Sequence, residues 1–237
     1  MTPLEVLALR YPTANFAGPS PIDLPGGLRT HLPGLFADLG YTRGAEIGVW
    51  RGEFSERLCA ENPALHLFCV DPWQAYPGYL APSGVELASD AYGQAQVRLA
   101  PYRVTILKKS SLAALEDIPD DSLDFVYIDG NHSFLHVVQD LEGWSQKVKP
   151  GGIVAGHDYH RFRPTLNLHV VEAVNGFTEA YLIRPWFLLG RTRVRHSEVR
   201  DRERSFLWVN PEHPVVRGEP LAAALRDAMS HSFRGPK

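Results

Sequence analysis

Four ionisable side chains follow two apolar segments in the second half of the chain. Asp129 and His132 come after the run "SLDFVYI", and His157 and Asp158 come after "GIVAG". If these runs form neighbouring strands, their ends lie about 5 Å apart. Two carboxylates that close are unfavourable unless a cation or a shared proton lies between them. Such oxygen ligands suit Mg²⁺, Ca²⁺ or Mn²⁺, and His132 could then take a proton from a metal-bound hydroxyl.

The same residues also have an ordinary structural explanation. Asp129 and Asp158 can cap loops, and the two histidines can be surface residues in a chain that has ten of them. All four residues stand at the ends of two strand-like segments that are expected to be neighbours. This grouping favours a role in metal binding and catalysis over the structural explanation.

A second group of residues has the pattern of a ligand loop. Gly48 and Gly52 lie in "EIGVWRGEFS", where a strand-like run gives way to a helix-like one. Glycines let a backbone approach a ligand, and a helix N-terminus offers free N–H groups. The spacing is not G-x-G-x-x-G, so a dinucleotide site is poorly supported. A turn that needs glycine for its conformation alone is the alternative.

Asp71 ends the next apolar run, 19 positions after Gly52. An acid at that place can accept hydrogen bonds from both hydroxyls of a ribose. Capping of a turn before Pro72 is the structural alternative. The glycine turn upstream favours ribose binding.

A parallel sheet is needed to bring these residues together. Strand-like and helix-like segments alternate, which predicts an α/β fold with helices on both faces. Ligands of such sheets bind outside the carboxyl ends of the strands. Ser110 and Ser111 follow another strand-like run, so polar groups from five strand ends should meet on one rim. The five strands are expected within 44–50, 65–73, 104–110, 122–129 and 152–159, and helices within 52–63, 91–102, 111–118, 133–148 and 169–181.

The rest of the chain is less regular. A short helix is expected near Leu4 to Leu9, followed by an irregular lead-in to residue 27 and a helix that begins or bends at Pro33. Residues 72–90 are expected to form a long loop. Two late strands within 181–190 and 205–210, and a surface helix within 221–232, complete the prediction.

Composition indicates an ordinary globular protein. The 237 residues are 44% apolar and 22% charged, with a formal net charge of −3, so the whole molecule does not attract nucleic acid or anionic membrane. Cys59 and Cys69 lie in apolar runs, which favours buried thiols and a reducing compartment. There is neither a signal-peptide pattern nor an apolar run of roughly 20 residues. We therefore expect a cytoplasmic protein.

Three further patterns have ordinary explanations. His136 and Asp140 lie four residues apart in a helix-like segment, and we interpret them as a solvated face. Arg184 to Arg204 contains seven arginines and three acids, which fits an exposed connection better than a site for RNA or another anion. The aromatic residues after the second strand could form a lid over the site or pack within a loop; they are Trp73, Tyr76, Tyr79 and Tyr92.

The segments "GAEIGVWRGEFSERL", "LFCVDPW" and "SLDFVYIDGNHSFLHVVQDLEGWSQKVKPGGIVAGHDY" resemble class I S-adenosylmethionine-dependent methyltransferases. The resemblance is to the branch of macrolide-sugar O-methyltransferases and covers about residues 40–160. It implies a Rossmann-like sheet of seven mostly parallel strands whose last strand is antiparallel. It also implies a lead-in at 1–40, a methyltransferase domain at 41–212 and a tail at 213–237.

The resemblance also implies roles for individual residues. Glu46, Gly48 and Gly52 would form the first cofactor loop near the methionine moiety, Asp71 would bind the ribose, and Ser110 and Ser111 would lie near the adenine. Asp129 would bind Mg²⁺ and His132 would be the general base. The family has two adjacent acids that also bind Mg²⁺ where this chain has His157 and Asp158, so these two residues would complete the metal site. An imidazole is a poorer ligand for Mg²⁺ than a carboxylate.

The sequence thus predicts an S-adenosylmethionine-dependent O-methyltransferase that acts on a small polyhydroxylated molecule with the help of Mg²⁺ or Mn²⁺. The expected partner is a small molecule rather than a membrane or a nucleic acid, and homo-oligomerisation stays open. The alternatives are a methyltransferase of RNA or protein, a NAD-dependent oxidoreductase, and a non-catalytic module that binds a nucleotide-like ligand.

Overall fold

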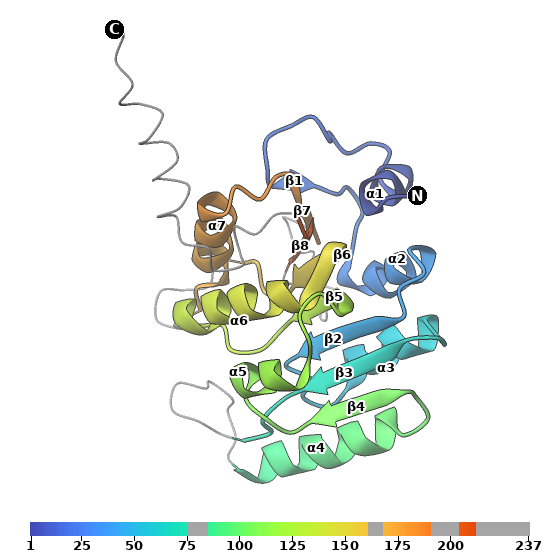
Figure 1. Ribbon diagram of the computed structural model, residues 1–237, viewed down its shortest axis with the longest axis vertical. Helices are drawn as coiled ribbons and strands as arrows, with labels where there is room; N and C mark the ends of the chain where they lie inside the picture. The colour runs from blue at the N-terminus through green and yellow to red at the C-terminus, as the bar shows by residue number, and fades with distance from the viewer. Residues whose placement is uncertain (75–84, 161–167, 191–203, 212–237) are drawn as a thin grey trace, which may run out of the picture.

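The computed structural model describes residues 1–74, 85–160, 168–190 and 204–211. A single sheet with the strand order β1-β7-β8-β6-β5-β2-β3-β4 forms its centre (Figure 1). The strands are β1 (Ile22–Asp23), β2 (Arg43–Ile47), β3 (His66–Val70), β4 (Val104–Leu107), β5 (Leu123–Ile128), β6 (Val148–Gly156), β7 (Trp186–Leu189) and β8 (Ser205–Val209). The helices are α1 (Pro3–Arg10), α2 (Leu32–Asp38), α3 (Glu53–Glu61), α4 (Val85–Leu99), α5 (Ser111–Ala114), α6 (Phe134–Lys147) and α7 (Val170–Ala180), with 3₁₀ turns η1 (Arg29–His31) and η2 (Leu115–Asp117).

The strand directions confirm the expected Rossmann-like fold. β4, β3, β2, β5 and β6 pair in parallel, and the last strand, β8, is antiparallel to both β6 and β7. An eighth strand adds to the seven that were expected. β1 pairs with β7 in parallel and consists of two residues within the Pro- and Gly-rich lead-in, where alternation of apolar residues is too short to detect.

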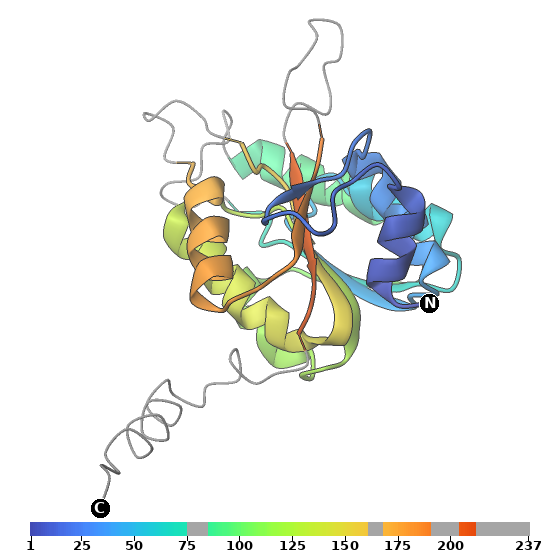
Figure 2. The same ribbon diagram turned by 90° about the horizontal axis from the view of Figure 1, so that it is seen from above.

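Helices cover both faces of the sheet, as Figure 2 shows from above. Side chains of α1, α2, α3 and α4 pack with Phe125 and Tyr127 of β5 in one apolar cluster. Side chains of α5, α6 and α7 pack with Val126 and Ile128 in the other. All six residues of β5 are buried, because a central parallel strand has a covered layer on each side.

Some boundaries differ from the expected ones. α4 begins at Val85, so the last part of the loop expected over 72–90 is helical. Its inner face follows helical spacing through Ala88, Ala91 and Ala95, but alanines mark an apolar face weakly in a sequence. Tyr76, Tyr79, most of the arginine-rich segment and the helix expected within 221–232 lie outside the described residues.

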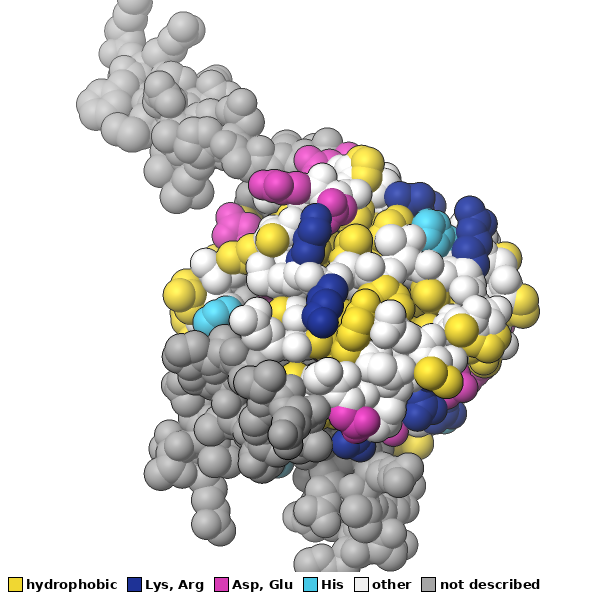
Figure 3. Space-filling view, turned by 90° about the horizontal axis from the view of Figure 1, so that it is seen from below, with side chains coloured by type: hydrophobic (Ala, Val, Ile, Leu, Met, Phe, Trp, Pro, Cys, Tyr) yellow, Lys and Arg dark blue, Asp and Glu magenta, His cyan; other side chains and the backbone are white. Residues whose placement is uncertain are grey.

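The described part of the chain has a mixed surface. On the face shown in Figure 3, Lys and Arg side chains of the described residues are scattered among uncharged ones. Cys59 and Cys69 are buried free thiols, as expected. No helix within the described ranges has both the length and the apolar composition needed to cross a bilayer.

Candidate functional site

The carboxyl ends of the central strands meet at one edge of the sheet. The N–H of Gly48 donates to the last carbonyl of β3 at 2.8 Å, and the N–H of Asp129 donates to the last carbonyl of β2 at 2.7 Å. The N–H of His157 donates to the last carbonyl of β5 at 3.0 Å. These bonds extend the strand ladders by one residue and hold the predicted side chains beside one another.

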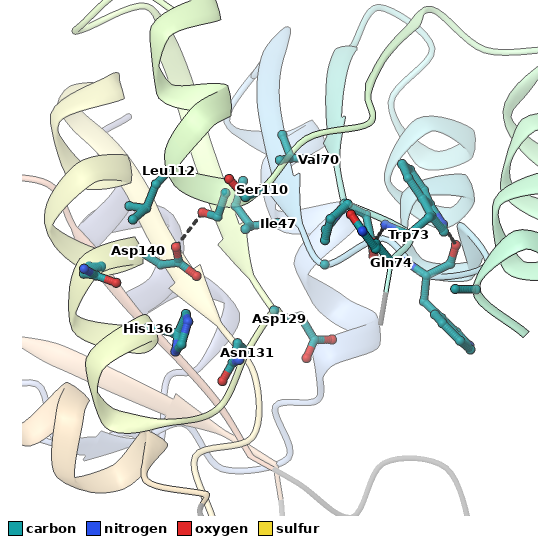
Figure 4. A pocket seen from close by; sticks show the side chains of 18 residues that line it. Ile47, Val70, Trp73, Gln74, Ser110, Leu112, Asp129, Asn131, His136 and Asp140 are labelled. Atoms are coloured by element: carbon teal, nitrogen blue, oxygen red, sulfur yellow. Dashed lines mark hydrogen bonds between the residues drawn. The ribbon is translucent and has the colours of Figure 1, made fainter. Parts of the chain in front are cut away.

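A cavity of about 520 Å³ opens at this edge (Figure 4). The predicted residues that line it are Gly48, Asp71, Ser110, Ser111 and Asp129. The predicted residues that do not line it are Glu46, Gly52, His132, His157 and Asp158. The structure therefore brings the glycine turn, the second strand end and the serines around one space, with the histidines and Asp158 beside it.

Gly48 is required by the close approach of two loops. Its φ is +91°, and a Cβ atom there would lie 2.1 Å from the carbonyl oxygen of Asp129. Gly52, at φ +75°, is the N-cap residue of α3. The backbone conformation thus favours glycine at both positions, and Gly48 also lines the cavity.

Asp71 caps the turn that follows its strand. Its Oδ2 accepts a hydrogen bond from the backbone N–H of Trp50 at 2.9 Å, and its Oδ1 accepts one from Trp73 N–H at 2.7 Å. Burial raises the pKa of Asp71, and these N–H groups oppose the shift. Because each carboxylate oxygen has two lone pairs, the capping role leaves acceptor capacity for a ligand in the cavity.

Asp129, His132 and Asp158 form the most highly charged part of the site. His132 Nε2 lies 2.7 Å from Asp158 Oδ2 and 3.7 Å from Asp129 Oδ1. Burial would lower the pKa of His132, but hydrogen bonds and charge from the two carboxylates outweigh it and raise the pKa to about 10. Burial likewise would raise the pKa of Asp158, but the two histidines hold it below its ordinary range.

His157 lies at the edge of the same group. Its Nδ1 is 3.5 Å from Asp158 Oδ1 and 3.7 Å from Asp129 Oδ1. Burial would lower the pKa of His157, and the charge of Asp129 leads the effects that raise it instead. The three donor atoms that lie within 4.8 Å of one another come from Asp129, His132 and Asp158, so His132 rather than His157 completes the compact donor set.

Arg29 is a site residue that the sequence did not predict. Its Nη1 donates to Asp129 Oδ2 at 3.0 Å, and its guanidinium lies 4.8 Å from the centre of the Phe54 ring. It comes from η1, one hundred positions before Asp129. No local pattern distinguishes such an arginine from a surface residue.

Asp140 contradicts the interpretation of a solvated face. Its side chain is buried and lines the cavity. His136 also lines the cavity but is exposed, and its Nδ1 contacts Ser133 Oγ at 2.6 Å. Asp140 shares helical spacing with the buried residues Val137 and Trp144. That spacing is the signal that could have placed it on the inner face of α6.

Two serines and a glutamate have defined structural partners. Ser110 is the N-cap of α5 and accepts the N–H of Ala113 at 3.3 Å. Ser111 Oγ donates to Asp140 Oδ1 at 2.5 Å. Glu46 is buried beneath the glycine turn and accepts the hydroxyl of Ser55.

Comparison with known proteins gives one family and many similar folds. The model of a family described as "Methyltransferase domain" matches residues 45–159. A curated protein of Sinorhizobium fredii, the uncharacterized protein y4gI, is 33% identical over 109 residues. That match covers 44% of this chain and 11% of the relative, so the chain spans only a small part of that protein's length.

Solved structures share the fold at low sequence identity. Cofactor-bound Rv0187 from MTB aligns with a TM-score of 0.56 at 14% identity, covering 88% of each chain. The O-methyltransferase TomG from Streptomyces achromogenes, solved in complex with SAM, aligns with a TM-score of 0.54 at 15% identity over 88% of this chain and 89% of that one. These similarities establish the fold.

Proposed function

We propose that this chain, whose residues 45–159 match the methyltransferase domain family, is an S-adenosylmethionine-dependent O-methyltransferase that acts on a small polyhydroxylated molecule. The observation that supports this most directly is the cavity at the strand ends, lined by Gly48, Asp71 and Ser111. Its volume of about 520 Å³ lies within the range typical of small-ligand sites. The family match favours this reaction over the oxidoreductase alternative.

The proposed reaction is an in-line displacement. The acceptor hydroxyl oxygen forms a bond to the methyl carbon while the carbon–sulfur bond breaks, and the electron pair of that bond returns to sulfur. The protein must align oxygen, carbon and sulfur near contact distance. The hydroxyl proton passes to Nε2 of His132, which must first be neutral to accept it.

The donor set beside the cavity fits a divalent cation. Asp129 and Asp158 offer carboxylate oxygens, and His132 offers a nitrogen within the same 4.8 Å group; carboxylates suit Mg²⁺ and Mn²⁺. A bound cation would lower the pKa of the acceptor hydroxyl. We assign Asp129 and Asp158 to the cation and leave His132 to act as the base, because its Nε2 cannot serve at once as ligand and base. His157, the further ligand expected from the sequence, lies outside the compact donor set.

Methyl transfer to a polyanion such as RNA is the rival proposal. It depends on the arginine-rich segment Arg184–Arg204, of which residues 191–203 lie outside the described part of the chain. The scattered basic side chains of the described residues in Figure 3 do not supply a patch on that face. Salt-dependent binding to RNA would favour this rival.

Calorimetric titration with S-adenosylhomocysteine tests the cofactor. We expect saturable binding, because the cavity is formed by the folded chain itself. Failure to bind it, together with tight binding of NADH, would select the oxidoreductase instead.

Titration with Mn²⁺ alone tests the cation. We expect a binding signal that is lost in Asp158→Asn and kept in Asp120→Asn, a matched change at an exposed aspartate that pairs with Lys147. A signal that persists in Asp158→Asn would remove this residue from the cation site.

A further inference from the structure

Asp140 is a buried carboxyl group with little to compensate its charge. It is 4% exposed, and in the described part of the chain no Lys, Arg or His side chain pairs with it. Burial raises its pKa to about 7, and the hydrogen bond from Ser111 opposes the shift. A buried carboxylate without a cation or several hydrogen bonds is costly. A function at the cavity would explain why an acid occupies this buried position.

A short relay fixes the side chain. Trp144 Nε1 donates to Ser111 Oγ at 2.7 Å, and Ser111 Oγ in turn donates to Asp140 Oδ1 at 2.5 Å. Trp144 is completely buried, so the indole N–H that begins this chain of hydrogen bonds is held in place by packing. Because the single hydroxyl proton of Ser111 is already used, Ser111 cannot donate it to a ligand.

The second oxygen of Asp140 lies beside another residue of the cavity wall. Asp140 lines the cavity, and its Oδ2 lies 3.6 Å from the position that a Cβ atom on Gly130 would occupy. Gly130 also lines the cavity, so this oxygen lies over a glycine rather than under a side chain. One oxygen of Asp140 is therefore held by Ser111, and the other is the oxygen that remains to accept a hydrogen bond from a ligand.

The cavity has two ends, which Figure 4 shows in one view. Trp73 and Gln74 lie at one end and Leu112, His136 and Asp140 at the other, with Asp129 between them. Asp71, whose carboxylate accepts the N–H of Trp73, belongs to the first end. If Asp71 takes the ribose, the base joined to that ribose extends toward the second end, where the apolar side chain of Leu112 can pack on a flat ring.

We infer that Asp140 accepts a hydrogen bond from the exocyclic amino group of the cofactor's adenine and thereby selects adenine over a base that has a carbonyl at the same position. The inference rests on the proposed function, since it takes S-adenosylmethionine as the ligand. Ser111 is then a positioning residue that acts through Asp140. Above its pKa of about 7, Asp140 is a carboxylate, which accepts a hydrogen bond from an N–H donor but repels a carbonyl oxygen.

The test compares S-adenosylhomocysteine with S-inosylhomocysteine, in which a carbonyl replaces the amino group. Binding of both is measured by calorimetry at a pH well above 7, where Asp140 is ionised, in the wild-type protein, in Asp140→Asn and in Glu142→Gln. The last is a matched acid-to-amide change on the exposed side of the same helix. The wild type and Glu142→Gln should prefer S-adenosylhomocysteine by about ten- to a hundredfold, the range for a hydrogen bond to a charged group. Asp140→Asn should lose most of this preference, because its amide can donate to the carbonyl.

The outcomes separate the two proposals. Equal affinity of the wild type for both ligands would overturn the role of Asp140 without the use of any variant. An Asp140→Asn protein that weakens both ligands by the same factor would also overturn it, since that is the result of a purely structural role. No binding of S-adenosylhomocysteine by the wild type would overturn the proposed function and this inference together.

Discussion

At the scale of single residues, His132 is held in its charged form by its neighbours. Its Nε2 faces Asp158 at 2.7 Å, and its pKa is raised to about 10. The imidazole therefore holds a proton at neutral pH while both carboxylates are free to attract it. A cation on those carboxylates would weaken that attraction and bring the pKa of His132 down toward the range of a useful base.

His132→Gln is expected to lower turnover by about 10²–10⁴-fold, the usual contribution of a general base, while the affinity for S-adenosylhomocysteine is unchanged. Turnover is measured as release of S-adenosylhomocysteine over a panel of sugars and glycosides. His31→Gln changes an exposed histidine of η1 and serves as the control. Wild-type turnover in His132→Gln would exclude it as the base.

The buried carboxyl group of Glu46 makes the stability of the fold depend on pH. Burial raises its pKa to about 8 from an ordinary value of 4.5, so between these pH values the folded protein holds a proton that the unfolded chain releases. The free energy of unfolding contributed by Glu46 is therefore full below pH 4.5, falls as pH rises through this window and levels off above about 8.

Glu46→Gln is expected to remove this part of the pH dependence, because an amide has no proton to lose. Urea unfolding at several pH values between 5 and 9 measures the change, with Glu53→Gln, an exposed position at the start of α3, as the control. An unchanged slope in Glu46→Gln would show that Glu46 is ionised in the folded protein.

Sequence reasoning found the residues whose neighbours in the chain mark them. Asp71, Asp129 and Asp158 each follow a buried strand, so their place at one sheet edge could be predicted. Arg29 could not be predicted, because its contact with Asp129 depends on how distant segments pack. Asp140 could have been placed from helical spacing, but an acid on an apolar face is ordinarily assigned to solvent.

At the scale of elements, the turn after β2 and the turn after β5 are in direct contact. Gly48→Ala would place a Cβ atom 2.1 Å from the carbonyl oxygen of Asp129. Gly40 also has a positive φ, +67°, but a Cβ there would meet nothing within 4 Å. Both substitutions strain the backbone, and only the first adds a clash.

Gly48→Ala is therefore expected to lower the free energy of unfolding by roughly 1–3 kcal/mol more than Gly40→Ala, the usual cost of overpacking. It should also weaken S-adenosylhomocysteine binding, whereas Gly40→Ala should not. Urea unfolding and calorimetry measure the two effects. Equal losses of stability in the two variants would mean that the turn after β5 can move to make room for the Cβ atom at no cost in free energy.

The order of strands and helices was predictable because each central strand is a nearly continuous apolar run. The two-residue β1 and the start of α4 were missed because neither has a strong apolar pattern. β1 exists through its pairing with β7, which is a long-range contact. Local sequence therefore determined the elements that position the cavity, and tertiary packing determined the edge of the sheet.

At the scale of the whole molecule, the first part of the chain belongs to the same core as the sheet. Leu7, Tyr11 and Ile22 lie in one apolar cluster with Tyr127 of β5. β1 pairs along β7, which would otherwise expose a strand edge. The lead-in thus contributes both packing and sheet pairing, in addition to the guanidinium of Arg29.

Arg29 lies outside the segment that the family model matches, whereas Asp129 lies inside it. A chimera that exchanged only residues 45–159 with a relative would keep or replace the carboxylate while leaving its ion-pair partner behind. An engineer who transfers this site between such proteins would have to move the opening forty residues with it, because its charge balance is shared between two separate stretches of the polypeptide.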